Sequence, residues 1–138
     1  MLVFAFQNIN YPAVLVCTVL AFAIGWMWYS VPVFGRIWMA GIPTIPAAGN
    51  DTAMKAMSIS FITTLMEMMA LNMVILLAGA ATVSEGVQIG ALVSAGFILM
   101  VLISNAMYET RPLSVLSINA GYRIVYYLVN GGIFAVWQ

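Results

Sequence analysis

Two residues of opposite charge, Glu67 and Arg123, lie deep inside long apolar stretches of this 138-residue chain. Each follows a basic residue near the start of its stretch, Lys55 or Arg111, by twelve positions. At ~1.5 Å per helical residue, both lie about 18 Å from the same end of a helical bundle. That depth is near the middle of a ~30 Å hydrocarbon layer. An ionisable residue there is costly and is a candidate functional site that needs a partner. We therefore expect Glu67 and Arg123 to pair inside a membrane.

Such a pair has three interpretations. As a structural bridge, it fixes the order and register of two helices, a use known for buried charged pairs. As a functional site, Glu67 binds a proton or an ion on a transport path that Arg123 gates. In the third interpretation, the two residues meet only across an interface between copies of the chain. The structural bridge is the interpretation that we favour.

Further polar residues accompany the pair on the same two predicted helices. Those on the later helix recur at i, i+4, i+7, i+8 and i+11, which places them on one helical face. Such a face must meet other helices or water, since lipid cannot satisfy it. The polar residues are Asn119, Arg123, Tyr126, Tyr127 and Asn130 on the later helix, and Ser60, Thr63, Thr64, Glu67 and Asn72 on the earlier one. We expect interhelical hydrogen bonds, with a hydrated cavity as the alternative.

Small residues spaced for close helix packing occur in a third apolar stretch. Gly86, Gly90 and Ser94 form a ridge at every fourth position, which lets a neighbouring backbone approach. The neighbour is either another helix of the chain or a second copy. Near the end of the last stretch, Gly131 and Gly132 predict a frayed helix end, with a hinge as the alternative.

Charged and aromatic residues are expected at the membrane–water interfaces. Aromatic side chains form an inner belt of Trp28, Tyr29, Trp38 and Tyr108 and an outer belt of Tyr11 and Trp137. Arg36 and Trp38 follow the first apolar stretch, where the arginine can snorkel and the indole can lie at headgroup level. Glu109 and Arg111 flank a tight turn before Pro112 and predict a hydrated pair of small energetic weight.

The composition excludes several classes of protein. With 64% hydrophobic and 6% charged residues, the chain is unlike a soluble domain, in which roughly a quarter of residues are charged. The net charge of zero, without a basic run, argues against nucleic acid as a partner. No histidine is present, and the eleven methionines have only the single Cys17 as another soft ligand, so we expect neither a metal site nor a cofactor.

The apolar stretches predict an all-α membrane protein, a single transmembrane domain built as a four-helix bundle. The expected spans are residues 12–33, 53–80, 84–108 and 112–137, each long enough to cross the hydrocarbon. Asn50, Asp51 and Thr52 are candidate caps for the second span, and Ser84 is one for the third. Residues 35–52 form one longer interfacial loop, in which Gly and Pro oppose a long helix.

The flanking basic residues predict the orientation. Arg36, Lys55 and Arg111 lie in the two connections at one end of the bundle, and the termini and the 81–85 turn carry none. The positive-inside rule then places both termini on the outer side of the membrane.

Two sequence stretches carry a family resemblance. Residues 28–39 read WYSVPVFGRIWM, and residues 108–113 (YETRPL) are followed by INAGYR at 118–123. The chain thereby resembles domain of unknown function 1761, a family of small bacterial integral-membrane proteins, over residues 10–137. Pro32 comes one position later than in the family pattern, so the end of the first span is expected to bend differently. The resemblance implies a four-helix bacterial membrane protein and carries over no catalytic residue.

These observations favour a non-enzymatic membrane subunit or scaffold in a bacterial cytoplasmic (inner) membrane, held together by the pair Glu67–Arg123. Its expected partners are the lipid bilayer and either further copies of the chain or the other subunits of a larger complex. The alternative is a small transporter or channel that uses Glu67 as its ion- or proton-binding carboxylate. A third class, an enzyme acting on a lipid or a quinone, lacks an obvious nucleophile.

Overall fold

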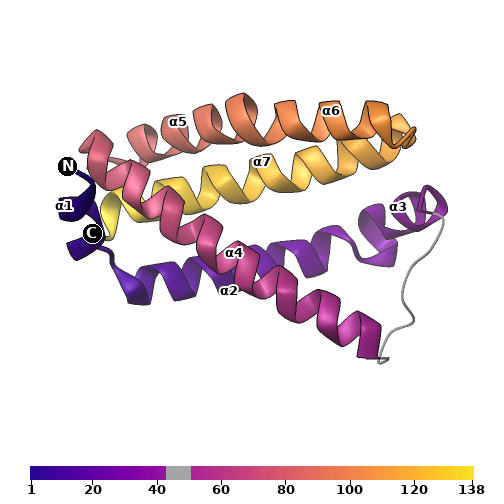
Figure 1. The fold of residues 1–138 in the computed structure, drawn as a ribbon, viewed down its shortest axis with the longest axis horizontal. Coiled ribbons are helices and arrows are strands. Elements are labelled where there is room, and N and C mark those ends of the chain that lie inside the picture. Colours follow the sequence, from indigo (N-terminus) through magenta and orange to yellow (C-terminus); the bar gives the residue numbers. More distant parts are fainter. Residues whose placement is uncertain (43–50) are drawn as a thin grey trace.

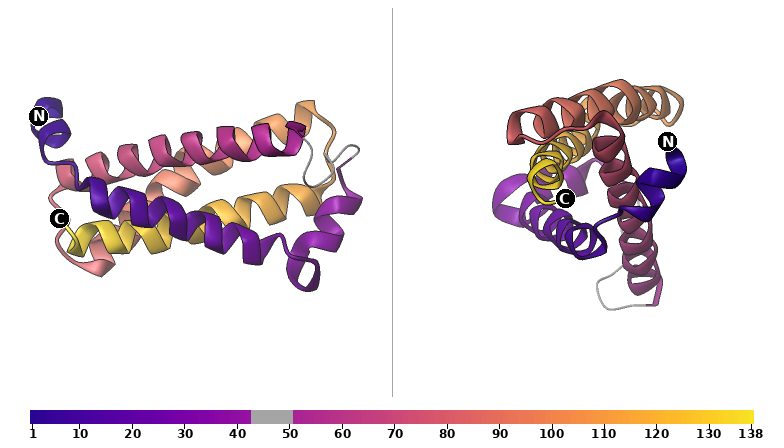
Figure 2. Two further views of the ribbon diagram at one scale, coloured as in Figure 1. Left: turned by 90° about the horizontal axis from the view of Figure 1, so that it is seen from below. Right: turned by 90° about the vertical axis from the view of Figure 1, so that its left-hand side faces the viewer.

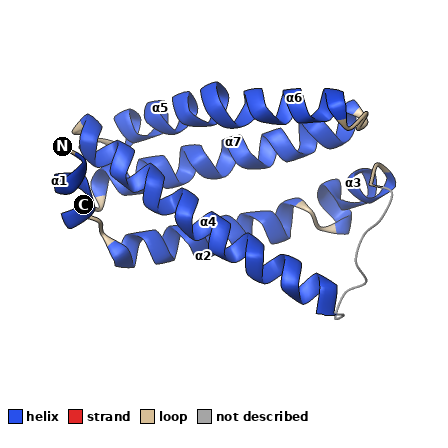
Figure 3. Cartoon of the chain, in the orientation of Figure 1, coloured by secondary structure: helices blue, strands red, loops and turns tan. Residues whose placement is uncertain are grey.

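The computed structural model describes residues 1–42 and 51–138, and these residues form helices and turns without a strand (Figures 1 and 3). The all-helical class is therefore confirmed. The elements are α1 (Leu2–Gln7), α2 (Tyr11–Trp28), the π-helical turn η1 (Val31–Gly35), α3 (Arg36–Ala40), α4 (Asp51–Ala78), α5 (Val83–Val93), the π-helical turn η2 (Ser94–Leu99), α6 (Met100–Tyr108) and α7 (Leu113–Val136).

The first expected span ends earlier than residue 33. Helix α2 stops at Trp28, and the chain bends through Tyr29 and Ser30 into η1. Pro32 is the cause, because proline has no N–H to bond to the carbonyl of Trp28 four residues earlier and its ring would clash with that carbonyl. The expected loop 35–52 is also shorter, since residues 36–40 form α3 and α4 already begins at Asp51. Of the three candidate caps, Asp51 and Thr52 belong to the first turn of α4, and Asn50 lies outside the described residues.

The turn between α4 and α5 is built by Gly79 and a capping box. Gly79 has a φ of +67°, a backbone conformation that favours glycine. The N-cap of α5 is Thr82, whose hydroxyl accepts from the Glu85 N–H while the Glu85 carboxylate accepts from the Thr82 N–H. The prediction of Ser84 as the cap was therefore wrong: Thr82 and Glu85 have the three-residue spacing that a capping box requires.

Helices α5 and α6, joined by η2, lie alongside α7, and α4 runs obliquely across the bundle (Figures 1 and 2). Both termini lie at one end, with the short helix α1 set crosswise beside them. The side chain of Asn10 donates to the carbonyl of Trp137, which ties the two ends of the chain together (3.2 Å).

Helix α7 is the central helix of the bundle. Within residues 118–135 only Val129 is exposed, and the buried members include Tyr126, Asn130 and Phe134. Three helices of the described chain are long and apolar enough to cross a membrane: Tyr11–Trp28, Asp51–Ala78 and Val83–Tyr108. The fourth expected span does not reach this apolarity, because α7 carries the polar residues that its neighbours enclose.

The glycines near the end of α7 do not fray it. The helix continues to Val136, and both Gly131 and Gly132 are buried. A Cβ on Gly131 would lie 2.4 Å from the carbonyl oxygen of Gly86. The glycines therefore serve close packing against α5, and the prediction of a frayed end was wrong.

Candidate functional site

The side chains of Glu67, Arg123 and Tyr126 form a closed triangle of hydrogen bonds between α4 and α7. Arg123 Nη1 lies 2.6 Å from both Glu67 Oε1 and Glu67 Oε2 and 2.5 Å from Tyr126 Oη. The Tyr126 hydroxyl donates to Glu67 Oε2 at 2.5 Å. The structure thus brings together three of the predicted residues within one chain, and both carboxylate oxygens are used.

The triangle is shielded but not sealed. The Arg123 and Glu67 side chains remain 34% and 25% exposed, whereas Tyr126 is buried. The guanidinium carbon lies 5.7 Å from the centre of the Tyr126 ring, within the range of a cation–π contact. Charge-assisted hydrogen bonds of this kind are roughly twice as strong as neutral ones, so the triangle is well suited to hold α4 against α7.

One helical turn before Arg123, Asn119 anchors the bent segment after α2. Its side-chain oxygen accepts from the Tyr29 hydroxyl (2.9 Å) and from Trp38 Nε1 (3.0 Å). Trp28 Nε1 donates to the backbone carbonyl of Ile118 (3.0 Å). The Trp38 indole, expected at headgroup level, is therefore half-buried and turned toward α7.

A second polar layer lies beyond the triangle, toward the termini. Asn130 Nδ2 donates to the Cys17 carbonyl and approaches Met68 Sδ, each at 3.3 Å. Asn72 Oδ1 accepts weakly from the Asn10 N–H (3.4 Å). Both asparagines are fully buried, and Asn130 Oδ1 and Asn72 Nδ2 have no hydrogen bond to any described residue. These asparagines join α2, α4 and α7, but they are less completely satisfied than the triangle.

A cavity of about 520 Å³ opens beside the triangle, in the angle between the first half of α4 and the helices α2, α3 and α7. Nearly all of residues 51–63 of α4 are exposed, which leaves this angle open. Ser60, Thr63 and Thr64 line the cavity from α4, and Arg123 lines it from α7. Thr63 also donates to the Ser60 carbonyl (3.0 Å).

The predicted small-residue ridge packs against α7. A Cβ on Gly86 would lie 2.1 Å from the Gly131 oxygen, and one on Gly90 would lie 2.3 Å from the Tyr127 oxygen. Ser94 is buried and donates to the Ala91 carbonyl (3.2 Å). Tyr127 belongs to this packing, and its ring lies tilted against that of Tyr126 with centres 5.0 Å apart. The Tyr127 hydroxyl makes no hydrogen bond within the described chain.

The remaining interfacial candidates lie at the end of the bundle opposite the termini. Glu109 and Arg111 form an ion pair whose side chains are about half exposed. Arg36 is exposed at the start of α3. Within the described residues, no hydrogen bond or ion pair joins any of the three to the triangle, so they do not belong to the polar site.

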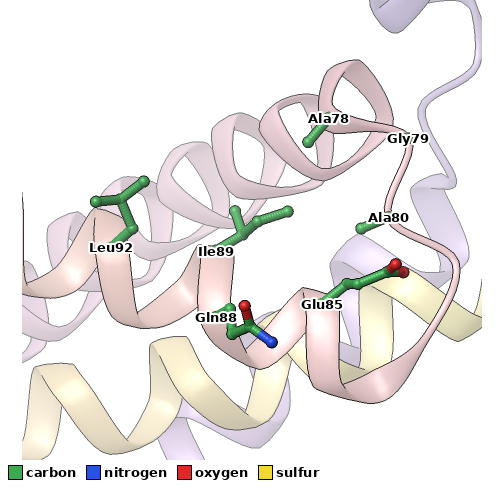
Figure 4. Close-up of a pocket in the computed structure, with 7 residues that line it drawn as sticks. All are labelled: Ala78, Gly79, Ala80, Glu85, Gln88, Ile89 and Leu92. Carbon is green, nitrogen blue, oxygen red and sulfur yellow. The ribbon is translucent and has the colours of Figure 1, made fainter.

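A second hollow, of about 400 Å³, lies at the terminal end of the bundle between α4 and α5 (Figure 4). Its acidic side chain, Glu85, is held by the backbone N–H groups of Ala81 (2.9 Å) and Thr82 (3.0 Å). The carboxylate therefore serves the capping box. No group of three or more His, Cys, Asp or Glu side chains gathers as metal ligands in the described residues.

Sequence reasoning missed the contribution of Tyr29 and Tyr122 to the site. The Tyr122 hydroxyl donates to the Ala21 carbonyl (3.0 Å), and its ring packs against Tyr29 with centres 5.4 Å apart. The signal was present in the two motifs at residues 28–39 and 108–123, which meet in space through Asn119. Their pairing points to one shared structural unit.

Comparisons with curated proteins and with solved structures gave no match. A family model, described as "Protein of unknown function (DUF1761)", matches residues 12–135. The match runs from the first turn of α2 to the last turn of α7 and includes both members of the ion pair. The chain belongs to the DUF1761 family.

Proposed function

We propose that this chain is a non-enzymatic integral-membrane protein that acts as a subunit or scaffold. The observation that carries the proposal is the division between its interior and its surface. Inside, the polar groups of Glu67, Asn119 and Arg123 join helices of the same chain. Outside, large apolar side chains are exposed along the helices, including Trp26 (82%) and Phe97 (68%). Such a surface requires lipid or a protein partner.

The three glutamates support a structural role. Glu67 binds Arg123, Glu85 caps α5, and Glu109 pairs with Arg111. Each contact positions a helix or a turn. In this proposal α7 is the fourth helix to cross the membrane, and its polar residues are tolerated because the other helices shield them from lipid.

A small transporter is the second candidate, and the cavity beside Arg123 favours it. This cavity gives access to the ion pair from the end of the bundle that carries the basic residues. Toward the termini, however, the route is filled by a buried apolar cluster that includes Met68, Leu71 and Ile75. Transport would require these side chains to separate, so the scaffold remains the better supported role.

We further propose a bacterial cytoplasmic membrane as the location, with both termini on its outer side. Arg36, Lys55 and Arg111 all belong to the end opposite the termini, in accordance with the positive-inside rule (Figure 1). A phosphatase reporter that is active only outside the cytoplasm should work at either terminus and fail after Arg111. Activity after Arg111 and none at the termini would reverse the orientation.

The subunit role is tested by mild solubilisation of a tagged chain from its native membrane, followed by native mass spectrometry. We expect a defined assembly, either with partner proteins at fixed stoichiometry or with further copies of this chain. Proton or ion flux measured in liposomes that contain only this chain should equal the flux in empty liposomes. A monomer without partners, together with a flux that Glu67→Gln abolishes, would replace the scaffold by the transporter.

A further inference from the structure

The cavity between α2, α3, α4 and α7 has the chemistry of a ligand site. Its volume of about 520 Å³ lies within the 300–1,000 Å³ typical of small-molecule pockets. It is amphipathic, because Arg123 and the hydroxyl-bearing residues of α4 line one part, and aromatic side chains of α2, α3 and α7 line another. Such a division suits a ligand with a polar head and an apolar body.

The polar part offers hydrogen-bond donors. Arg123 uses Nη1 for Glu67 and Tyr126, whereas its Nη2 and Nε donate to none of the residues that the structure describes. A guanidinium has five N–H donors, so three remain for a ligand. Thr64 lines the same cavity, and its hydroxyl likewise has no hydrogen bond within the described chain. The head of a matching ligand therefore carries acceptors.

The charge of the site selects a neutral head. Glu67 lies 2.6 Å from Arg123 Nη1 and compensates the guanidinium charge. An anionic head near Arg123 would approach this carboxylate as well, and the repulsion would offset the attraction. A carbonyl oxygen can accept from Nη2 or Nε without adding a charge. Carbonyl groups therefore fit the donors better than a carboxylate or a phosphate does.

The aromatic part suits a planar ring. Tyr29 packs against Trp38 and Tyr122 with ring centres 5.0 and 5.4 Å apart, and all three line the cavity. Trp26, also at the cavity, is 82% exposed on the face that lipid would cover in the proposed membrane placement. A ring packed against the cavity side of these aromatic residues could keep its apolar tail in the bilayer.

We infer that this cavity binds a planar, neutral, carbonyl-bearing lipid of the quinone class, with a ring carbonyl on the free donors of Arg123. The ring packs in the cavity against the wall that Tyr29, Trp38 and Tyr122 form, and the tail leaves past Trp26. This inference rests on the membrane placement in the proposed function, and it adds a ligand to the scaffold. It includes binding only, without electron transfer.

The test is a titration of the protein in nanodiscs with a decyl-substituted benzoquinone. Binding is monitored as quenching of tryptophan fluorescence. Trp26 and Trp38 line the cavity and report binding there. We expect saturable quenching that decylbenzene, which lacks carbonyls, and decanoate, which is anionic, do not compete away. Dioctanoylglycerol, a carbonyl lipid without a ring, should also fail to compete. Equal competition by any of the three compounds would overturn the inference.

Two substitutions on α4 provide a matched comparison. Ser60→Leu places a larger side chain in the cavity and should weaken benzoquinone binding by about tenfold or more. Ser58→Leu makes the same change at an exposed serine of α4 that does not line the cavity, and it should leave the affinity unchanged. Equal affinities of the Ser60 variant and the parent would contradict the proposed site.

Arg123→Lys tests the donors directly. Lysine keeps a positive charge for Glu67 but lacks the planar fork of the guanidinium, so we expect roughly tenfold weaker benzoquinone binding. Undiminished affinity in a folded Arg123→Lys protein would contradict the role of Arg123.

Because binding is measured on the isolated chain, a negative result leaves the subunit assignment standing. Conversely, loss of the native partners in the assembly experiment does not affect the titration.

Discussion

Glu67→Gln should lower the free energy of unfolding in detergent by about 3 kcal/mol. The substitution leaves the Arg123 guanidinium between helices without its counter-ion, and breaking one partner of a buried pair costs about 3–5 kcal/mol. We expect the lower end of this range because the Arg123 and Glu67 side chains are 34% and 25% exposed, so water can partly solvate the unpaired guanidinium. The measurement is the midpoint of unfolding by a denaturing detergent, with the loss of helix monitored by circular dichroism.

The double variant Glu67→Gln, Arg123→Met separates the pair from its members. Once both charges are gone, no charge remains uncompensated, and much of the lost stability should return. Glu109→Gln is the matched control, since it breaks the exposed pair with Arg111 and should change stability by less than about 1 kcal/mol. A double variant as unstable as Glu67→Gln alone would show that the pair does not act as a unit.

The contact between Glu67 and Arg123 could be predicted from sequence because the rise per residue of a helix is constant. Counting twelve residues from Lys55 and from Arg111 puts both side chains at the same level, and the structure places them in contact. Tyr126 was predicted on the same helical face as Arg123, but its hydrogen bonds to both charged residues were not predicted. Helical rise and periodicity were sufficient for the level of the pair and for the shared face.

Features that depend on the choice of neighbours could not be predicted. The face of α7 was recognised as polar, but its position at the centre of the bundle was not, because hydropathy describes each helix alone. Tryptophan is a typical residue of the membrane interface, yet the hydrogen bond from Trp38 to Asn119 directs its indole toward α7. This bond joins residues 81 positions apart in sequence, and it forms only because the chain bends after α2.

The two wrong predictions at helix ends have different causes. The cap of α5 could have been predicted, because Thr82 but not Ser84 has a glutamate three residues later, which is the spacing of a capping box. By contrast, two adjacent glycines in α7 indicate flexibility when α7 is considered alone. In the structure, the absence of a Cβ on Gly131 instead allows α7 to contact the backbone of Gly86 on α5.

That contact leads to the second large expected effect, for Gly86→Ala. An added Cβ would lie 2.1 Å from the Gly131 oxygen and 2.7 Å from the Ala135 Cβ. Both atoms belong to α7, and no side-chain rotation can move them away. The helices must separate, and we expect a loss of about 1–3 kcal/mol, as for other overpacked sites. The measurement is again the denaturation midpoint in detergent.

Gly96→Ala, in the same long helical segment, is the control. A Cβ there has no atom within 4 Å, so the extra methyl group should not lower stability.

The comparison also shows whether the ridge of Gly86, Gly90 and Ser94 packs against α7 or against a second copy of the chain. If Gly86 and Gly90 instead pack between two copies of the chain, Gly86→Ala would reduce the dimer fraction in sedimentation while the monomer unfolded as before. Loss of stability without a change in oligomeric state places the ridge against α7, where separation of the two helices also disturbs Tyr127 and the neighbouring Tyr126 of the triangle.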